Sequence, residues 1–346
     1  MIIVGLPIGL IGVVLPVFRR LDIDRLPVLA SARRGVLAAV IVMLAGAVAL
    51  FIAQVMPLEL EFDSPMAWME FVQLSLLGQM LIARLGLGLV ALIALLWTIW
   101  QRAGQNRSIG ALVVCALIGF AAQATITRTS HSAAMDAGWM PVAADFAHLF
   151  AGALWGGGLV AVIIAVHHVR RTNLADERGA VIEASRALIR RFSPLAILGV
   201  SLAAGTGVAL TSVHVGDADA LRTSDYGRLI LLKIGLATLA IALAAWHKFV
   251  TWRRMNTLAD VRRFSHRLLI EASLVFGIFA GAAWLTSTSP PHHTVIHHMA
   301  DGTSHMMMIA DPDFQRLLLI AALAILSAGI VAVVLEWRDR LSSTQR

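Results

Sequence analysis

Long apolar runs alternate with short polar connections along the whole chain. Nine of these runs approach the length of about 20 residues that a helix needs to cross the hydrocarbon core of a bilayer. The predicted spans lie near residues 1–18, 35–56, 78–100, 108–127, 143–166, 192–213, 226–247, 267–288 and 315–336. This pattern predicts an all-α fold, a polytopic bundle of about nine transmembrane helices.

Charge gives the bundle an orientation. Of the 28 lysines and arginines, 22 fall in alternate connections and in the C-terminal tail, which are expected to face the cytoplasm. The N-terminus is therefore predicted outside and the C-terminus inside. The net charge of +7 does not indicate nucleic-acid binding, because the basic residues sit in short clusters between apolar runs.

An internal similarity divides the chain. SLLGQMLIARLGLGLVAL from Ser75 resembles SDYGRLILLKIGLATLAI from Ser224, which pairs Arg84 with Lys233. We interpret this as a parallel repeat of four spans plus a ninth. The predicted units are a first repeat with a short first span at 1–142, a second repeat at 143–291, an extracytoplasmic loop at 292–314, and a last span with a cytoplasmic tail at 315–346. The opening DFAHLFAGALW of the fifth span has no counterpart in the first repeat.

The loop before the last span is rich in histidine and methionine. Imidazole and thioether groups on the outer face of a membrane suit copper, as Cu(I) or Cu(II), and the lone Cys115 excludes a cysteine-based site. The alternative is a polar loop without a ligand. The predicted ligands of this loop are His292, His293, His297, His298, Met299, His305, Met306, Met307 and Met308.

A second candidate metal site lies at the outer end of the fifth span, in SHSAAMDAGWMPVAADFAHLFAGALWGGG. Helical spacing puts Asp145 and His148 on one face, at a depth where polar groups need a partner or a cation. His131 and Met135 are close enough in sequence to reach the same mouth. The alternative is a structural hydrogen bond from His148 to Asp145 or to a neighbouring helix.

Two further charges lie within predicted spans. Lys233 is expected to play a structural role, either paired with Asp145 or extended toward the outer surface. Glu271 has two open interpretations. It either receives a cation or proton that leaves inward, or it anchors Arg267 or His266 at the inner interface.

With these residues in place, the chain resembles the CopD (PcoD/YcnJ-like) copper-resistance family over roughly residues 75–291. The motifs that carry the resemblance are SHSAAMDAGW, DFAHLFAGALWGGGL, RRFSPLAILGVSLAAGTGVAL, TSDYGRLILLKIGLATLAIAL and RLLIEASLVFGIFAGAAWLTSTSPP. The resemblance implies that His131, Asp145 and His148 contact copper. It also implies that Tyr226, Lys233 and Glu271 are typical of the domain, and that a periplasmic copper chaperone of the CopC type is a partner.

These observations predict copper import from the periplasm across the bacterial inner membrane, in copper homeostasis and resistance. The sequence contains no P-loop and no phosphorylation-type aspartate in a soluble domain that could drive a pump, so transport without a nucleotide site is predicted. An enzyme is not expected. The first alternative is a membrane protein that binds copper, or helps to assemble a copper site, without transport. The second is a b-type cytochrome with haem between His148 and His214.

Overall fold

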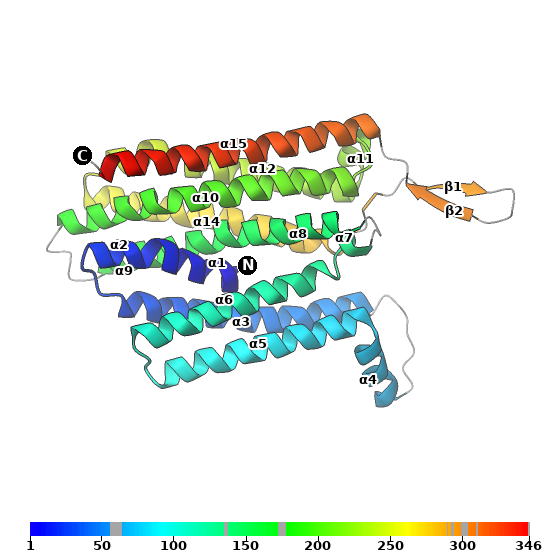
Figure 1. Ribbon diagram of the computed structural model, residues 1–346, viewed down its shortest axis with the longest axis horizontal. Helices are drawn as coiled ribbons and strands as arrows, with labels where there is room; N and C mark the ends of the chain where they lie inside the picture. The colour runs from blue at the N-terminus through cyan, green and yellow to red at the C-terminus, as the bar shows by residue number, and fades with distance from the viewer. Residues whose placement is uncertain are drawn as a thin grey trace.

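The protein is described by a computed structural model that covers residues 1–55, 64–134, 138–171, 178–288, 290–291, 294–298, 304–308 and 311–344. Within these ranges nine helical stretches are long and apolar enough to cross a membrane. They lie side by side in one bundle (Figure 1). The predicted all-α, multi-pass fold is therefore confirmed.

The described helices of the first half alternate between long spans and short surface turns. They are α1 (Ile2–Gly9), the π-helix η1 (Leu10–Val14), α2 (Leu15–Arg20), α3 (Leu26–Val55), α4 (Pro65–Leu74), α5 (Leu76–Trp100), α6 (Gln105–Thr127) and α7 (His131–Ala134).

The second half has a similar alternation and two further π-helices. Its elements are α8 (Trp139–Gly152), η3 (Ala153–Gly157), α9 (Gly158–Arg171), α10 (Arg178–His214), α11 (Ala218–Thr223), α12 (Asp225–Trp246), η5 (His247–Thr251), α13 (Trp252–Arg254) and α14 (Leu258–Leu285). The chain continues with β1 (Thr294–His298), β2 (Ser304–Met308) and α15 (Pro312–Thr344).

The bundle has two chemically different ends. The short helices α4, α7 and α11 and the β1–β2 hairpin gather at one end, which we name the outer end because the charge pattern predicts it outside (Figure 1). The α2–α3 and α5–α6 turns lie at the opposite end, which carries arginines and is named the basic end. The outer end and the basic end are the two reference points for the position of each residue of the candidate site.

Three helices begin well before the apolar runs predict. The second span was expected from residue 35 and begins at Leu26, and the sixth was expected from residue 192 and begins at Arg178. The eighth was expected from residue 267 and begins at Leu258. The added turns of the sixth span contain arginine, glutamate and alanine, which favour helix outside the membrane as well as inside it. The apolar pattern therefore located the spans but underestimated these three helices.

The described parts of the predicted loop 292–314 include a two-stranded antiparallel hairpin. Its backbone register pairs Thr294 with Met308 and His297 with His305. β1 begins with Thr294, Val295 and Ile296, and β-branched residues favour strands. The hairpin is a local exception within an otherwise helical fold.

The fifth span, formed by α8, η3 and α9, is the central helix of the bundle. Of its most apolar window, 72% is buried, compared with 11% for the corresponding window of α15. α1 crosses it in backbone contact, since a Cβ atom added to Gly5 would lie 1.7 Å from the Ala153 carbonyl oxygen. A Cβ atom on Gly157 would lie 2.5 Å from the Gly5 backbone. Glycines on both helices make this crossing possible.

The two sequence-related regions share a local structure. Ser75 caps α5 by accepting a hydrogen bond from the Gly78 amide, and Ser224 caps α12 by accepting one from Gly227, at 3.0 Å in both cases. Each capped helix follows a short helix, α4 or α11, at the outer end. This likeness supports the predicted repeat, whose boundaries stay a prediction.

Candidate metal site

Three aromatic side chains from three helices meet at the outer end. The ring centroids of His131 (α7) and His214 (the last residue of α10) are 6.5 Å apart. Tyr226, in the first turn of α12, lies 6.4 Å from the first ring and 6.2 Å from the second. His214 and Tyr226 are 7% and 5% exposed, so the polar atoms of this group lie in a largely enclosed place. We name these three residues the outer cluster.

Hydrogen bonds define which nitrogens of the outer cluster can accept a ligand. The Nδ1 atom of His214 lies 2.8 Å from the Leu210 carbonyl oxygen, so in the neutral ring Nδ1 donates and Nε2 carries the lone pair. That Nε2 atom lies 3.4 Å from the Ser132 hydroxyl. The Nε2 atom of His131 is buried and has no hydrogen-bond partner among the described residues. Within this pair, Nε2 of His214 is thus positioned to accept from the Ser132 hydroxyl, and Nε2 of His131 is the buried nitrogen without a partner among the described residues.

Asp145 brings a carboxylate to the outer cluster. It lies on α8 near the outer end, close to the Ser130 side chain, and interacts electrostatically with His131 and His214. A carboxylate near two imidazoles within a membrane protein favours a bound cation or proton. Asp145 is thus coupled to His131, and its role as a metal ligand stays a prediction.

His148 occupies a different place. Its Nδ1 atom lies 2.9 Å from the Ala203 carbonyl oxygen and 3.2 Å from the Thr206 hydroxyl, both on α10. Ala203 precedes His214 by eleven residues, which is about 16 Å along a helix axis. His148 is therefore not brought together with His131 in one ligand set, although Asp145 is only one turn away from it. Its hydrogen bond follows the structural alternative, a bond to a neighbouring helix.

The separation of His148 from His214 along α10 also tests whether these two residues could hold haem. Two histidines that hold one haem must face each other at the same depth. His148 contacts the middle of α10, whereas His214 ends that helix. The pair expected to hold haem is thus spread along the bundle axis.

The loop ligands are described only in part. Met135, His292, His293 and Met299 lie outside the described residues. The backbone of the hairpin sets His297 opposite His305 and Ile296 opposite Met306. His298, Met307 and Met308 belong to the same strands. A metal role for this loop stays a prediction.

The donor set of the outer cluster is small. Among the described residues, no group of three or more His, Cys, Asp or Glu side chains is arranged to hold a metal ion. With metal–nitrogen bonds of about 2 Å, two imidazoles that share one ion have ring centroids about 6 Å apart, close to the separation of His131 and His214. Imidazole suits copper, and two nitrogens with a nearby carboxylate form an open site from which an ion can leave.

Lys233 is a positive charge that acts on the residues of the candidate site. It lies on α12, seven residues after Tyr226, and interacts electrostatically with both Asp145 and His148. This interaction with Asp145 acts without a direct ion pair among the described residues, so the expected pairing stays a prediction. Its charge offsets that of the carboxylate and opposes a cation in the same region.

Glu271 has a partner that the sequence analysis did not anticipate. Its Oε2 atom lies 3.0 Å from Nδ1 of His247, and both side chains are almost fully buried. Arg267, one of the anchors expected for it, instead hydrogen-bonds to the Thr251 hydroxyl at 3.5 Å. A hydrogen-bonded carboxylate–imidazole pair thus lies at the basic end.

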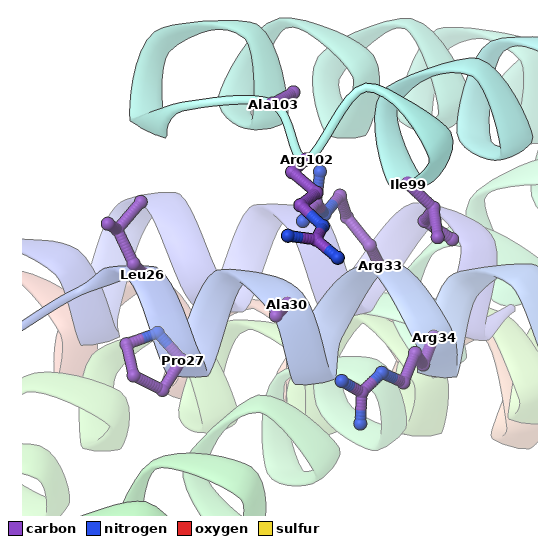
Figure 2. A pocket seen from close by; sticks show the side chains of 8 residues that line it. All are labelled: Leu26, Pro27, Ala30, Arg33, Arg34, Ile99, Arg102 and Ala103. Carbon is purple, nitrogen blue, oxygen red and sulfur yellow. The ribbon is translucent and has the colours of Figure 1, made fainter.

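A cavity of about 400 Å³ also lies at the basic end, between the start of α3 and the α5–α6 turn. Figure 2 shows the side chains of Arg33, Arg34 and Arg102 around it. Three guanidinium groups repel a metal cation, so this cavity is not a copper site.

His214 is the member of the outer cluster that sequence reasoning placed least well. It was weighed only as a haem ligand at the edge of a loop, and Tyr226 only as a residue typical of a domain. The available signal was the shared end of their helices, because His131, His214 and Tyr226 all lie near predicted outer boundaries. Which of them touch is decided by tertiary packing.

Comparison with known proteins identifies part of the chain. Residues 186–285 match the sequence profile of CopD, described as Copper resistance protein D. The chain is 28% identical over 167 residues to the Copper transport protein CutJ of Bacillus subtilis (strain 168), a match that covers 47% of this chain. The match covers 28% of that relative's length. No solved structure matches the chain.

The matched region holds several of the residues described above. His214, Tyr226, His247 and Glu271 lie within residues 186–285, whereas His131 and Asp145 precede them. The matched residues begin within α10 and end with the last residue of α14. This segment of the chain is therefore similar to the CopD family, as the motifs in the sequence led us to expect.

Proposed function

We propose that the protein transports copper across the bacterial inner membrane, inward from the periplasm, and that it contributes in this way to copper homeostasis and resistance. The observation that carries the proposal is the outer cluster, in which two imidazoles lie together inside a polytopic bundle and are coupled electrostatically to the carboxylate of Asp145. The CopD match and the copper transport protein among its relatives support copper as the cargo.

The chemistry of the cluster suits a cargo better than a resident cofactor. A resident ion is commonly held by three or four protein ligands in a closed site. The described outer cluster offers fewer, so an ion bound by His131 and His214 would exchange readily. Asp145 would balance its charge, and the hairpin histidines and methionines would supply ions from the outer side.

In this proposal the ion binds first between the two imidazoles. The Leu210 carbonyl oxygen holds the His214 ring in the tautomer whose Nε2 accepts a ligand. The arriving cation offsets the carboxylate of Asp145, a role that Lys233 performs in its absence. His148, whose ring contacts α10 between Ala203 and Gly207 and so lies about 10 to 16 Å from His214 along that helix, is proposed as a later contact. A periplasmic chaperone of the CopC type is the proposed donor.

Copper uptake into proteoliposomes tests this function. We expect His131→Asn and His214→Asn each to reduce the initial rate of Cu(I) uptake at least tenfold, because each removes one of two nitrogen ligands. His167→Asn is a matched control, since this histidine is exposed near the basic end and should leave uptake unchanged. Unaltered uptake in both outer-cluster variants would contradict the proposed site.

The alternatives give different results in the same preparation. A copper-binding or assembly protein would bind copper at the outer cluster, with a loss in the two variants, but the wild-type protein would show no uptake. A cytochrome would show the intense visible absorption of haem in the purified protein. The proposal expects neither result.

A further inference from the structure

A second polar pair lies at the opposite end of α12 from the outer cluster. His247 is the first residue of η5, and its Nδ1 atom is 3.0 Å from the Glu271 carboxylate on α14. Their side chains are 5% and 3% exposed. The ring of Phe264 packs edge-on against the imidazole at 5.3 Å. We name His247 and Glu271 the inner pair.

The second imidazole nitrogen of the inner pair, Nε2 of His247, makes no hydrogen bond to any described residue. This nitrogen is buried. Buried polar atoms are nearly always hydrogen-bonded, so this atom points to a ligand that the chain itself does not supply. The basic-end cavity lined by arginines is a separate feature and does not include His247.

The possible protonation states of the inner pair all carry a cost. If Glu271 is charged and His247 is neutral, Nδ1 donates to the carboxylate, Nε2 keeps its lone pair, and one negative charge is buried without a balancing cation on the pair. If the imidazole is also protonated, the charges balance but the Nε2–H group lacks an acceptor. A protonated Glu271 that donates to Nδ1 again leaves the proton of His247 on Nε2 without an acceptor. Both kinds of defect are unfavourable in a buried place.

We propose that the inner pair is a Cu(I) site on the cytoplasmic side, in which Nε2 of His247 binds the ion and Glu271 orients the ring and balances the charge. This inference rests on the proposed function, in which copper is the cargo. A monovalent soft cation on the Nε2 lone pair removes both defects at once, because it balances the buried carboxylate and leaves no N–H group without an acceptor. A carboxylate behind a metal-binding histidine is a common arrangement in metal sites.

The inner pair is distinct from the outer cluster. Tyr226 and His247 are 21 residues apart along α12 and its continuation, which corresponds to about 30 Å along a helix axis. One continuous helix therefore joins a polar group at the outer end to another at the basic end. An ion bound at the inner pair has crossed most of the membrane.

The nearby cations have other partners. Lys248, the next residue after His247, forms an ion pair with Glu336 of α15. Arg267 hydrogen-bonds to Thr251, and Arg190 lies over the Trp252 ring. These positive groups are directed to other partners, and the carboxylate of Glu271 is directed to His247. With one protein nitrogen in the first shell, the site would hold copper weakly and release it to the cytoplasm.

Copper titration of the full-length protein tests the inner pair. The starting protein is the double variant His131→Asn, His214→Asn, in which the outer cluster no longer binds. Competition with a chromogenic Cu(I) chelator measures the remaining affinity in detergent. We expect a further His247→Asn substitution to lower the number of bound copper equivalents by one, and Glu271→Gln to weaken binding of that equivalent 10- to 100-fold, as substitution behind a metal ligand does.

The hairpin histidines and methionines could also bind copper, so the titration needs a spectroscopic readout. X-ray absorption at the copper edge reports nitrogen ligation, and we expect the nitrogen contribution of the double variant to fall with His247→Asn, whereas the contribution of the hairpin histidines stays unchanged. Asparagine retains an N–H group for Glu271, which limits damage to the fold. Glu271→Gln serves as the second variant, because it keeps the size of the side chain and an oxygen acceptor.

His168→Gln provides a matched control. Its Nε2 atom is also buried without a hydrogen-bond partner among the described residues, but its own hydrogen bond goes to the backbone of Asp24 rather than to a carboxylate. We expect the copper affinity to be unchanged in this variant.

The outcomes separate the two proposals. Equal copper affinity and equal absorption spectra with and without His247 would overturn the inner site while leaving outer-cluster transport intact. A wild-type protein that neither binds nor transports copper would instead overturn the proposed function. A weaker nitrogen signal in His168→Gln, equal to that in His247→Asn, would also overturn the assignment, since the carboxylate would then have no special role.

Discussion

Arg84 and Lys233 occupy matched positions in the two sequence-related halves, yet their surroundings differ. The Arg84 guanidinium donates to the Thr125 hydroxyl, the Thr125 carbonyl oxygen and the Thr129 hydroxyl, at 2.9, 2.8 and 2.7 Å. Lys233 interacts electrostatically with Asp145 and His148. One cation is thus bound within its own half by neutral groups, and the other is coupled to the groups of the candidate site.

The difference shows how a similar framework can carry chemistry in one half only. In the first half the buried cation joins α5 to α6 and leaves no carboxylate or imidazole nearby among its hydrogen-bond partners. In the second half the corresponding cation faces a carboxylate that an arriving metal ion can also neutralise. We therefore assign a structural role to Arg84 and an electrostatic role in copper binding to Lys233.

The framework itself should respond equally in both halves. A Cβ atom on Gly78 would lie 2.0 Å from the Val72 carbonyl oxygen, and one on Gly227 would lie 2.4 Å from that of Leu221. We expect Gly78→Ala and Gly227→Ala each to lower the free energy of unfolding by about 3 kcal/mol, because backbone must move in both. Titration with SDS in mixed micelles measures this. A large loss in only one variant would break the structural likeness of the halves.

Exchanging the matched cations sharpens the comparison. Arg84→Lys places the second-half residue in the first half, and an ammonium group cannot reproduce the forked contacts with two threonines. We expect the free energy of unfolding to fall by about 2 kcal/mol, with unchanged copper affinity. Lys248→Arg, at an ion pair that either cation can form, serves as the control in the same SDS titration. A change in copper affinity without a loss of stability would contradict a structural role for Arg84.

Removing the second-half cation should act on copper. Lys233→Met takes away a positive charge that opposes a metal ion near Asp145. We expect the outer cluster to bind Cu(I) about tenfold more tightly, equivalent to about 1.4 kcal/mol. Chelator competition measures the affinity, and Lys233→Arg should retain the wild-type value. Weaker binding in Lys233→Met would show that the lysine supports the site rather than opposing the ion.

The helix caps give the smallest expected effect. Ser75 and Ser224 each accept a hydrogen bond from a glycine amide at the start of a long helix. Ser75→Ala and Ser224→Ala should each cost about 1 kcal/mol of unfolding free energy. Thr238→Ala, at an exposed site within α12, is a control expected to change stability less. Unequal losses of unfolding free energy in the two variants would show that the two caps contribute differently to stability.

The fold was largely predictable because the membrane restricts the chain to long apolar helices. Nine spans followed from run length, and the exceptions arose where polar residues extend a helix or where the loop before the last span forms strands. The π-helical turns within spans were not predictable. The described π-helices contain ordinary apolar or polar residues, and no local pattern distinguishes them from the α-helix around them.

The candidate site was predictable by residue type but not by partner. His131 and Asp145 were identified from their depth and from the soft ligands around them. Helical spacing suggested that His148 would join them, but the ring instead contacts α10, because spacing defines a face and not the neighbour that the face meets. The partnership of His247 with Glu271 joins two helices across 24 residues, at the first residue of a π-helix, and no spacing rule reports it.

The crossing of Gly5 with Gly157 limits how the two halves can move. Backbone meets backbone there, so a shift along either helix axis would force larger neighbouring side chains into the same space. A second close approach lies one turn further on, where a Cβ atom on Gly9 would be 2.7 Å from the Cα atom of Gly158. Because the two helices touch at successive turns, tilting one against the other is opposed as well, and we expect α1 to move with the fifth span as one unit.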